Sequence, residues 1–300
     1  MGPFSVRRTR AVTQPETGQG YYPRRLDRRS RPRPPLHFRR LELKYFLPDR
    51  WIRHLIEQVS PFTEIDPYLV REGRGRTSYP VTSLYFDSYD LSSFFEKENG
   101  LLFRRKIRLR TYEQVFSPEY PCFIEVKRRL DSVVIKDRLA LPAGALDPSV
   151  PISALLRHLL DHAERDPLTS TEACAMASWL NLVPTAVVRY QRTALVGTAD
   201  RSLRITVDRS LEGSFRPASY LGPSPLRSIS NINPLGTTGI TGRYALLELK
   251  CNNVIPAWLH RVIRQMELMR TAYSKYYLTV AALRPRLRED CDPQFLAVSA

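Results

Sequence analysis

This 300-residue sequence contains many lysines and arginines that alternate with apolar residues, and these basic side chains are its best candidates for binding a ligand. The two-residue period occurs in residues 40–45, 102–112, 121–129, 132–140, 185–196, 202–208 and 243–251. Successive side chains of a β-strand point to opposite faces, so each segment predicts a strand with one charged and one apolar face. The basic residues at the alternating positions are Arg40, Lys44, Arg104, Lys106, Arg108, Arg110, Lys127, Arg129, Lys136, Arg138, Arg192, Arg204 and Lys250.

One strand of this kind would normally turn its charged face to solvent. Seven such strands, with few uncharged polar residues, instead favour a sheet that curls around its charged face. The predicted helices between the strands have apolar faces of their own, and these find a partner if they cover the apolar outside of the sheet. An eighth strand is predicted over residues 79–86. We therefore predict an α+β fold, an eight-stranded antiparallel β tunnel with flanking helices and a basic lumen.

The basic lumen indicates the class of ligand. Like charges enclosed together are costly unless a ligand compensates them, and a chain of phosphates offers oxygens to lysine ammonium and arginine guanidinium groups alike. We therefore expect a linear polyphosphate or a nucleoside triphosphate. Glu42, Glu125 and Glu248 lie on the same charged faces and would repel phosphate directly. Each is expected to bind Mn2+ or Mg2+, which bridge carboxylate and phosphate oxygens, or to pair with a neighbouring lysine.

Apolar residues at helical spacing predict the helices that flank the strands. They are expected in residues 49–59, 151–163 and 170–180, after Pro256 and from about Ser274. Asp87 or Ser88 is expected to cap a short helix that follows residues 79–86.

Other segments predict irregular structure. Residues 1–40 hold eleven arginines and only two acids, a large part of the net charge of +16. This composition predicts a disordered basic arm over residues 1–37, before a domain of residues 38–284 and a C-terminal tail of residues 285–300. Residues 209–242 are rich in Pro, Gly and Ser and predict a long loop.

Composition also excludes several classes of protein. No apolar run approaches the roughly 20 residues of a membrane helix, so no membrane span is expected. The four cysteines lack CxxC spacing and predict free thiols in a reducing compartment, and hence a cytoplasmic protein. Zinc-finger spacing and RNA-recognition aromatic motifs are absent, so no specific nucleic acid partner is expected.

The charged segments form motifs in a characteristic order along the chain. They are Arg40-Leu-Glu42-Leu-Lys44-Tyr45, Ser83-Leu-Tyr-Phe-Asp87, Arg105-Lys106-Ile-Arg108-Leu-Arg110-Thr-Tyr112, Phe123-Ile-Glu125-Val-Lys127, Tyr190-Gln-Arg192, Arg204-Ile-Thr-Val-Asp208, Leu247-Glu248-Leu-Lys250, Pro256-Ala-Trp258-Leu259 and Ser274-Lys275-Tyr276. Over roughly residues 38–283 this set resembles the VTC (vacuolar transporter chaperone) domain, a polyphosphate polymerase domain of the triphosphate tunnel metalloenzyme superfamily. Arg40 stands where the wider superfamily often has a first Glu, which favours the VTC branch over the triphosphatase and cyclase branches.

The resemblance implies roles for the matching residues. Glu248 would hold the metal, and Glu42 is the acid of the first strand. The residues expected to contact the phosphates in catalysis are Lys44, Arg108, Arg110, Lys127, Arg192, Arg204 and Lys275. The residues expected to bind the substrate are Lys106, Lys136, Arg138, Tyr190 and Lys250.

The function that the resemblance implies is that of a metal-dependent polyphosphate polymerase, which transfers the γ-phosphoryl group of ATP to a polyphosphate chain. The acceptor is already an anionic phosphate oxygen, so no general base is needed. Two alternatives on the same fold stay open, a hydrolase of triphosphate or polyphosphate and a non-catalytic polyphosphate-binding module. Whether a membrane-protein partner takes up the product is also open.

Overall fold

The computed structural model describes residues 40–284, apart from 68, 70–75, 131–132, 143, 164–166, 224, 232–241 and 253. The chain divides into two units, Met1–Pro32 and Arg33–Ala300, and all described residues belong to the second. The predicted arm of residues 1–37 and the predicted tail of residues 285–300 lie outside the described residues. Within the described part, no helix has the length and apolar character needed to cross a membrane.

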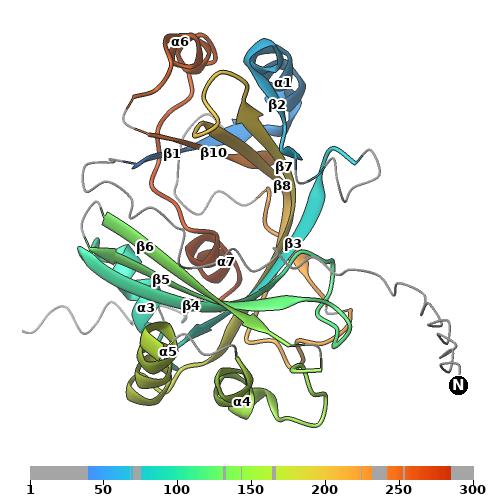
Figure 1. Cartoon of the computed structure of the whole chain (residues 1–300), viewed down its shortest axis with the longest axis vertical. Helices are drawn as coiled ribbons and strands as arrows, with labels where there is room; N and C mark the ends of the chain where they lie inside the picture. The colour runs from blue at the N-terminus through green and yellow to red at the C-terminus, as the bar shows by residue number, and fades with distance from the viewer. Residues whose placement is uncertain are drawn as a thin grey trace, which may run out of the picture. The chain divides into compact units, whose positions relative to one another are not determined.

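One antiparallel sheet forms the framework of the second unit (Figure 1). Its main strands lie in the order β1 (Arg40–Pro48), β10 (Tyr244–Asn252), β8 (Arg204–Phe215), β7 (Val183–Gly197), β3 (Tyr79–Asp87), β4 (Phe103–Thr111), β5 (Cys122–Leu130) and β6 (Val133–Leu141). The short strands β2 (Thr63–Ile65) and β9 (Arg227–Ser228) pair with β7 and β8. The predicted eight-stranded antiparallel sheet is confirmed. Between the described residues of β1 and β6 there is no ladder, so the sheet is not closed by hydrogen bonds.

Helices cover the apolar outer face of the sheet in two groups (Figure 1). The helices are α1 (Ile52–Val59), α4 (Leu155–His162), α5 (Pro167–Trp179) and α6 (Ala257–Gln265), with 3-10 turns at Asp49–Trp51, Ser60–Phe62 and Ile152–Ala154. Leu159 of α4 belongs to the same buried core as Ile124 of β5. Leu55 of α1 and Leu259 of α6 belong to a second core, with strands β1, β8 and β10. The helices therefore cover the apolar outside of the sheet, as predicted.

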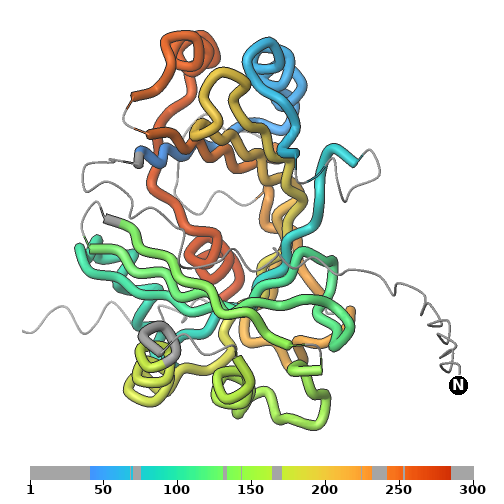
Figure 2. Tube along the Cα trace, viewed as in Figure 1, coloured from blue at the N-terminus to red at the C-terminus, as the bar shows by residue number. Residues whose placement is uncertain are grey.

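The opposite side of the sheet carries helix α7 (Lys275–Leu283), and we call this side the inner face. Figure 2 shows the sheet curving around α7. The Ser274 side chain caps the helix by accepting a hydrogen bond from the Tyr277 amide at 3.4 Å. Leu278 packs with Val81 and Val188 in an inner core. Part of the inner face is thus apolar and filled by α7.

Helix α3 (Ser92–Glu98) follows β3 after a short connection, and both residues predicted as its cap, Asp87 and Ser88, accept hydrogen bonds from backbone amides of its first turn. The Asp87 carboxylate accepts hydrogen bonds from the backbone amides of Ser93 at 2.8 Å and Phe94 at 3.1 Å. The hydroxyl of Tyr276 also donates to Asp87, and this contact joins α7 to the end of β3.

The predicted loop over residues 209–242 is wrong in its first part, because β8 continues to Phe215. There β8 pairs with β7, with Gly213 opposite Val188. A Cβ atom on Gly213 would lie 2.6 Å from Thr279 Cγ2 of α7 and 2.8 Å from the Val187 carbonyl oxygen. The glycine therefore permits close packing between helix and strand. Residues 232–241 of the predicted loop lie outside the described residues.

Candidate active site

Three lysines form a row across the inner face. The strand register places Lys106 of β4 opposite Lys127 of β5, and Lys127 opposite Lys136 of β6. Burial lowers the pKa of Lys106 and Lys136 to about 7 and that of Lys127 to about 8. Lys106 Nζ lies 3.4 Å from the Ser274 hydroxyl, and Lys127 forms no hydrogen bond or ion pair with the described residues. The row therefore has unused capacity to bind an anion.

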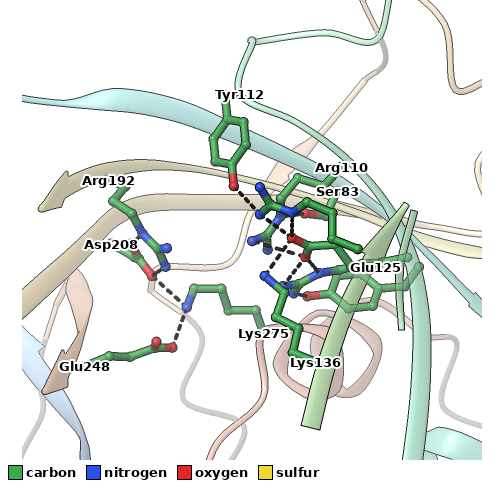
Figure 3. Close-up of polar contacts among 12 residues, drawn as sticks. Ser83, Arg110, Tyr112, Glu125, Lys136, Arg192, Asp208, Glu248 and Lys275 are labelled. Carbon is green, nitrogen blue, oxygen red and sulfur yellow. Dashed lines mark hydrogen bonds and ion pairs between the residues drawn. The ribbon is translucent and has the colours of Figure 1, made fainter. Parts of the chain in front are cut away.

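Glu125, only 1% exposed, lies two residues from this row and is surrounded by four cations (Figure 3). Its Oε1 atom lies 2.6 Å from Lys136 Nζ and 2.6 Å from Arg138 Nη2. Its Oε2 atom lies 2.7 Å from Arg108 Nη2 and 3.5 Å from Arg110 Nη1. Burial alone would raise the pKa of Glu125, but the cations, Arg110 first, lower it well below its usual range. The cluster keeps a net positive charge.

Hydroxyl groups orient the arginines of this cluster. Arg108 Nη1 donates to Tyr85 at 2.7 Å, Arg110 Nε to Ser83 at 3.1 Å and Arg138 Nη2 to Tyr112 at 2.7 Å. Arginine held in this way keeps its remaining N–H groups in fixed directions, and such groups suit phosphate oxygens. The buried Tyr190 hydroxyl accepts from Arg110 Nη2 at 3.5 Å, so the predicted phosphate-binding tyrosine lies among the cations.

A second network joins α7 to strands β7, β8 and β10 (Figure 3). Arg192 forms a two-pronged ion pair with Asp208, with Nε and Nη2 at 2.6 and 2.7 Å from its oxygens. Lys275 Nζ lies 2.6 Å from Asp208 Oδ2 and 2.9 Å from Glu248 Oε1. Burial would lower the pKa of Lys275, but Asp208 and Glu248 raise it above its ordinary value. A buried cation at the N-terminus of a helix is unfavourable without such partners.

Strands β1 and β10 add a patch of alternating charge. The register places Lys44 opposite Glu248 and Glu42 opposite Lys250. Lys44 Nζ lies 3.1 Å from Glu42 Oε1, and Lys250 Nζ lies 3.3 Å from Glu248 Oε2. Burial would raise the pKa of Glu42, but Lys44 and then Lys127 lower it to about 2. The pKa of Glu248 is lowered well below its usual range against the effect of burial, chiefly by Lys275. Both carboxylates are ionised at neutral pH.

Glu42 and Glu248 are the residues that fit a divalent metal best. Mg2+ commonly takes one or two carboxylates and completes its coordination with water and substrate phosphate. The described residues contain no group of three or more His, Cys, Asp or Glu arranged to hold a metal, so the substrate would have to supply ligands. Glu125 contacts four cations, whereas Glu248 contacts two, Lys275 and Lys250. The metal role of Glu125 stays a prediction.

The predicted site residues come together on the inner face, with Arg204 at its margin. Arg204 pairs with Asp66 and is 44% exposed, although the register places it opposite Lys250. Asp208 was not among the predicted site residues, yet it pairs with two of the predicted cations, Arg192 and Lys275. Asp208 alternates with Arg204 in the sequence, and that signal could have found it. Ser83 and Tyr85 come from a strand without alternating charges, so periodicity gave no signal for them.

Comparison with known proteins places the chain in a family. Residues 39–284 match the family model of the VTC domain. No curated protein matches. Similar solved structures include a putative adenylyl cyclase from Hippeastrum described as having a dominant triphosphatase activity, with 13% identity, a TM-score of 0.44, and coverage of 82% of this chain and 98% of that one. A putative adenylate cyclase from Bacillus halodurans has 10% identity and a TM-score of 0.41, over 78% of this chain and 92% of that one.

A protein from Pyrococcus horikoshii has 12% identity and a TM-score of 0.40, over 81% of this chain and 99% of that one. Structural similarity at this level carries no conclusion about activity. The VTC match is different, because it spans most of the sequence and includes every strand, every helix and every predicted site residue described above. This chain belongs to the VTC domain family.

Proposed function

We propose that this protein is a metal-dependent polyphosphate polymerase, which transfers the γ-phosphoryl group of ATP to the end of a polyphosphate chain. The observation that carries the proposal is the row of Lys106, Lys127 and Lys136 beside the arginines around Glu125, a set of cations that one carboxylate does not neutralise. Membership of the VTC domain family supports the same substrate class.

A linear chain of phosphates suits this arrangement better than a compact anion does. The cations come from β1, β4, β5, β6, β7, β10 and α7, and no single phosphate group could contact all of them. A polyphosphate chain brings many phosphates at the entropic cost of binding one molecule. Hydroxyl partners already orient Arg108, Arg110 and Arg138, so bound phosphoryl oxygens would meet guanidinium groups that are held in place.

The reaction breaks the bond between the γ-phosphorus of ATP and the oxygen that bridges it to the β-phosphate. A terminal oxygen of the polyphosphate chain forms the new bond to that phosphorus, and ADP leaves. The attacking oxygen is already ionised, so no proton has to be removed. The reaction therefore needs no histidine as a general base. The histidines that the structure describes lie on the outer helices, and they are His54, His158, His162 and His260.

The chain's own residues would act by position and charge. Arg108 and Arg110 would stabilise the negative charge of the transferring phosphoryl group, and Lys275 would hold the neighbouring phosphate from α7. Mn2+ or Mg2+ held by Glu248 and Glu42 would supply further neutralisation of that charge. Phosphoryl transfer depends largely on positioning and electrostatic stabilisation, and these groups would supply both.

Product analysis tests the proposal. The purified 300-residue chain is incubated with ATP and Mn2+, and the products are separated on a gel that resolves phosphate chains. We expect long chains and ADP, and we expect both to be lost in Glu248→Gln but kept in Met269→Ser, a change at an exposed residue outside the inner face. Free phosphate in place of chains would identify a hydrolase. Tight polyphosphate binding without turnover would identify a binding module.

A further inference from the structure

The ends of β4, β5 and β6 carry exposed apolar side chains outside the site described above. We call this cluster the strand tip, and its residues are Leu101, Leu102, Phe103, Leu130, Val134 and Ile135. Their exposed fractions run from 42% for Val134 to 65% for Leu102. The register places Phe103 directly opposite Leu130, so the members are neighbours in space. Soluble monomers rarely leave such contiguous apolar clusters in water unless the cluster binds something.

The strand tip is apolar on both faces of the sheet. Phe103, Leu130 and Ile135 point to the outer face, the same side as the buried Ile107 and Val126 further along the strands. Val134 points to the inner face, because it lies two residues before Lys136. A flat protein surface would cover one of these faces and leave the other exposed. An apolar medium that receives the ends of the strands would cover both.

Arginines follow directly behind the apolar residues. Arg104 and Arg129 are opposite each other in the next row, and Arg105 lies one residue further back, with its guanidinium 4.4 Å from the centre of the Phe103 ring. One and two residues correspond to about 3 and 7 Å along a strand. Apolar groups of surface-bound proteins reach about 5–10 Å into the boundary between lipid headgroups and acyl chains. Arginines at this spacing would lie at the level of the lipid phosphates.

Asp137 and Glu172 are the carboxylates on the outer face beside the strand tip, and both pair with Arg128. Glu96 lies close enough to Arg104 and Arg105 to interact with both. One carboxylate beside these two arginines leaves a net positive charge there. Arginine side chains also carry long apolar stems that can lie along the boundary while the charge stays in the headgroup layer. The connection between β5 and β6, Asp131-Ser132, lies outside the described residues.

We propose that the strand tip docks this protein onto the surface of an anionic lipid bilayer, with its apolar side chains in the acyl boundary and its arginines against the headgroup phosphates. The proposal is independent of the polymerase reaction, because the apolar residues of the strand tip take no part in the site.

Vesicle flotation with the full chain tests the proposal. The probes are phosphatidylcholine vesicles with and without phosphatidylserine, and the variant is Leu130→Asn with Ile135→Thr, two exposed residues whose replacement leaves the core intact. The matched control is Val254→Asn with Met269→Thr, which are 74% and 78% exposed and lie away from the strand tip. We expect the tip variant to lose binding to anionic vesicles on the order of tenfold and the control to bind like the parent.

The basic segment of residues 1–40 would attract anionic vesicles by charge alone, so binding is also measured at high salt. Salt screens exposed charges strongly but leaves apolar insertion in place. We expect the difference between the tip variant and the control to persist at high salt. Equal binding of the two at both salt concentrations would overturn the proposal.

A measurement of the insertion depth tests the proposal without a variant that loses binding. Leu130→Trp places a fluorophore in the strand tip, and Val254→Trp places one at the control position. Lipids brominated near the headgroup should quench the added fluorescence of Leu130→Trp and not that of Val254→Trp. Absence of quenching at position 130 would contradict insertion. The protein could also form a dimer in the absence of lipid. If the tip variant were monomeric and still bound vesicles like the parent, a second copy of the chain would occupy the strand tip, and this would equally overturn the proposal.

Discussion

The ammonium group of Lys275 lies 2.9 Å from a carboxylate oxygen of Glu248. Glu248 is the residue proposed to hold the metal, and Lys275 is a cation proposed to hold phosphate. Their contact links α7 to β10, and Asp208 completes it at 2.6 Å from the same ammonium. Each group at the heart of the site is therefore kept charged by another, even before a substrate binds.

Replacement of Lys275 by Met should destabilise the ligand-free protein strongly. Asp208 and Glu248 would remain buried without their shared partner, and breaking a buried pair in this way typically costs about 3–5 kcal/mol. In the parent, the lowered pKa values of both carboxylates contribute stability at neutral pH that is lost as the pH falls. In Lys275→Met the pKa values should rise, so the deficit relative to the parent should shrink toward acidic pH.

Urea denaturation of parent and variant at neutral pH and at about pH 5 measures this deficit. Lys250→Met is the matched control, because Lys250 also contacts Glu248 but is partly exposed. The control should lose much less stability. Equal losses for both variants at both pH values would show that Lys275 has no special role in the network.

Glu125→Gln should distinguish a carboxylate that neutralises cations from one that binds the metal. The change removes the counter-charge of four cations, so the ligand-free protein should melt at a lower temperature. Added tripolyphosphate should restore stability, because phosphate replaces the lost negative charge. The dissociation constant for Mn2+, measured in the presence of tripolyphosphate, should weaken far less in Glu125→Gln than in Glu248→Gln. Equal weakening in both variants would assign Glu125 to the metal site after all.

Lys127→Met should leave the ligand-free protein as stable as the parent or more so. Lys127 has no ion pair with the described residues, and its lowered pKa shows that its environment disfavours the charge. Arg108→Met should instead lower stability, because Arg108 pairs with Glu125 at 2.7 Å. Both variants should bind tripolyphosphate more weakly. Thermal melts with and without ligand measure both effects, and a large loss of ligand-free stability in Lys127→Met would rule out its role as an unpaired anion ligand.

Binding of tripolyphosphate at about pH 8 should take up protons. Lys106 and Lys136 have pKa values of about 7 and Lys127 of about 8, so part of the row is neutral at that pH without ligand. Bound phosphate favours the charged ammonium and raises these values. Affinity should therefore fall as the pH rises from about 6 to about 9. Calorimetry in two buffers of different ionisation enthalpy measures the uptake, and Lys127→Met should reduce it.

The same lysines make the stability of the ligand-free protein depend on pH in the direction opposite to ligand affinity. Their pKa values are lower in the folded state than in the unfolded chain, so the unfolded chain binds more protons between about pH 7 and 10. Stability from this source therefore rises with pH over that range, while ligand affinity falls. The effect should be smaller for Lys136, which is partly exposed and pairs with Glu125.

The charged faces could be predicted because they depend on neighbours along the chain. Period-two alternation identified Lys106, Arg108 and Lys127 as residues of shared faces, and a sheet whose outer face is covered by helices leaves those faces inside. The pairing partners could not be predicted in the same way. In its own strand Glu125 could have been either a metal ligand or the partner of a lysine, and only the register of three strands shows that four cations surround it.

Composition misled the prediction where a residue serves packing between distant elements. Gly213 indicated a loop, yet it lies in β8. A glycine is needed there because α7 passes too close to the strand for a side chain. Asp208 was visible on an alternating face, but its importance follows from Lys275, which lies on a helix far along the chain. Long-range contacts of this kind are decided by the fold and leave little trace in a local pattern.

The inner face is proposed to form one continuous site for a chain of phosphates. Thermal melts of the protein with orthophosphate, tripolyphosphate and long-chain polyphosphate, at equal concentrations of phosphate units, test this. Ligand that binds only the folded state stabilises it by about 2.7 kcal/mol at a hundred times its dissociation constant. We predict small shifts with orthophosphate and large shifts with both chains, because one chain reaches cations of several strands together. Equal shifts for all three ligands would contradict the account, since they would mean that each phosphate binds on its own.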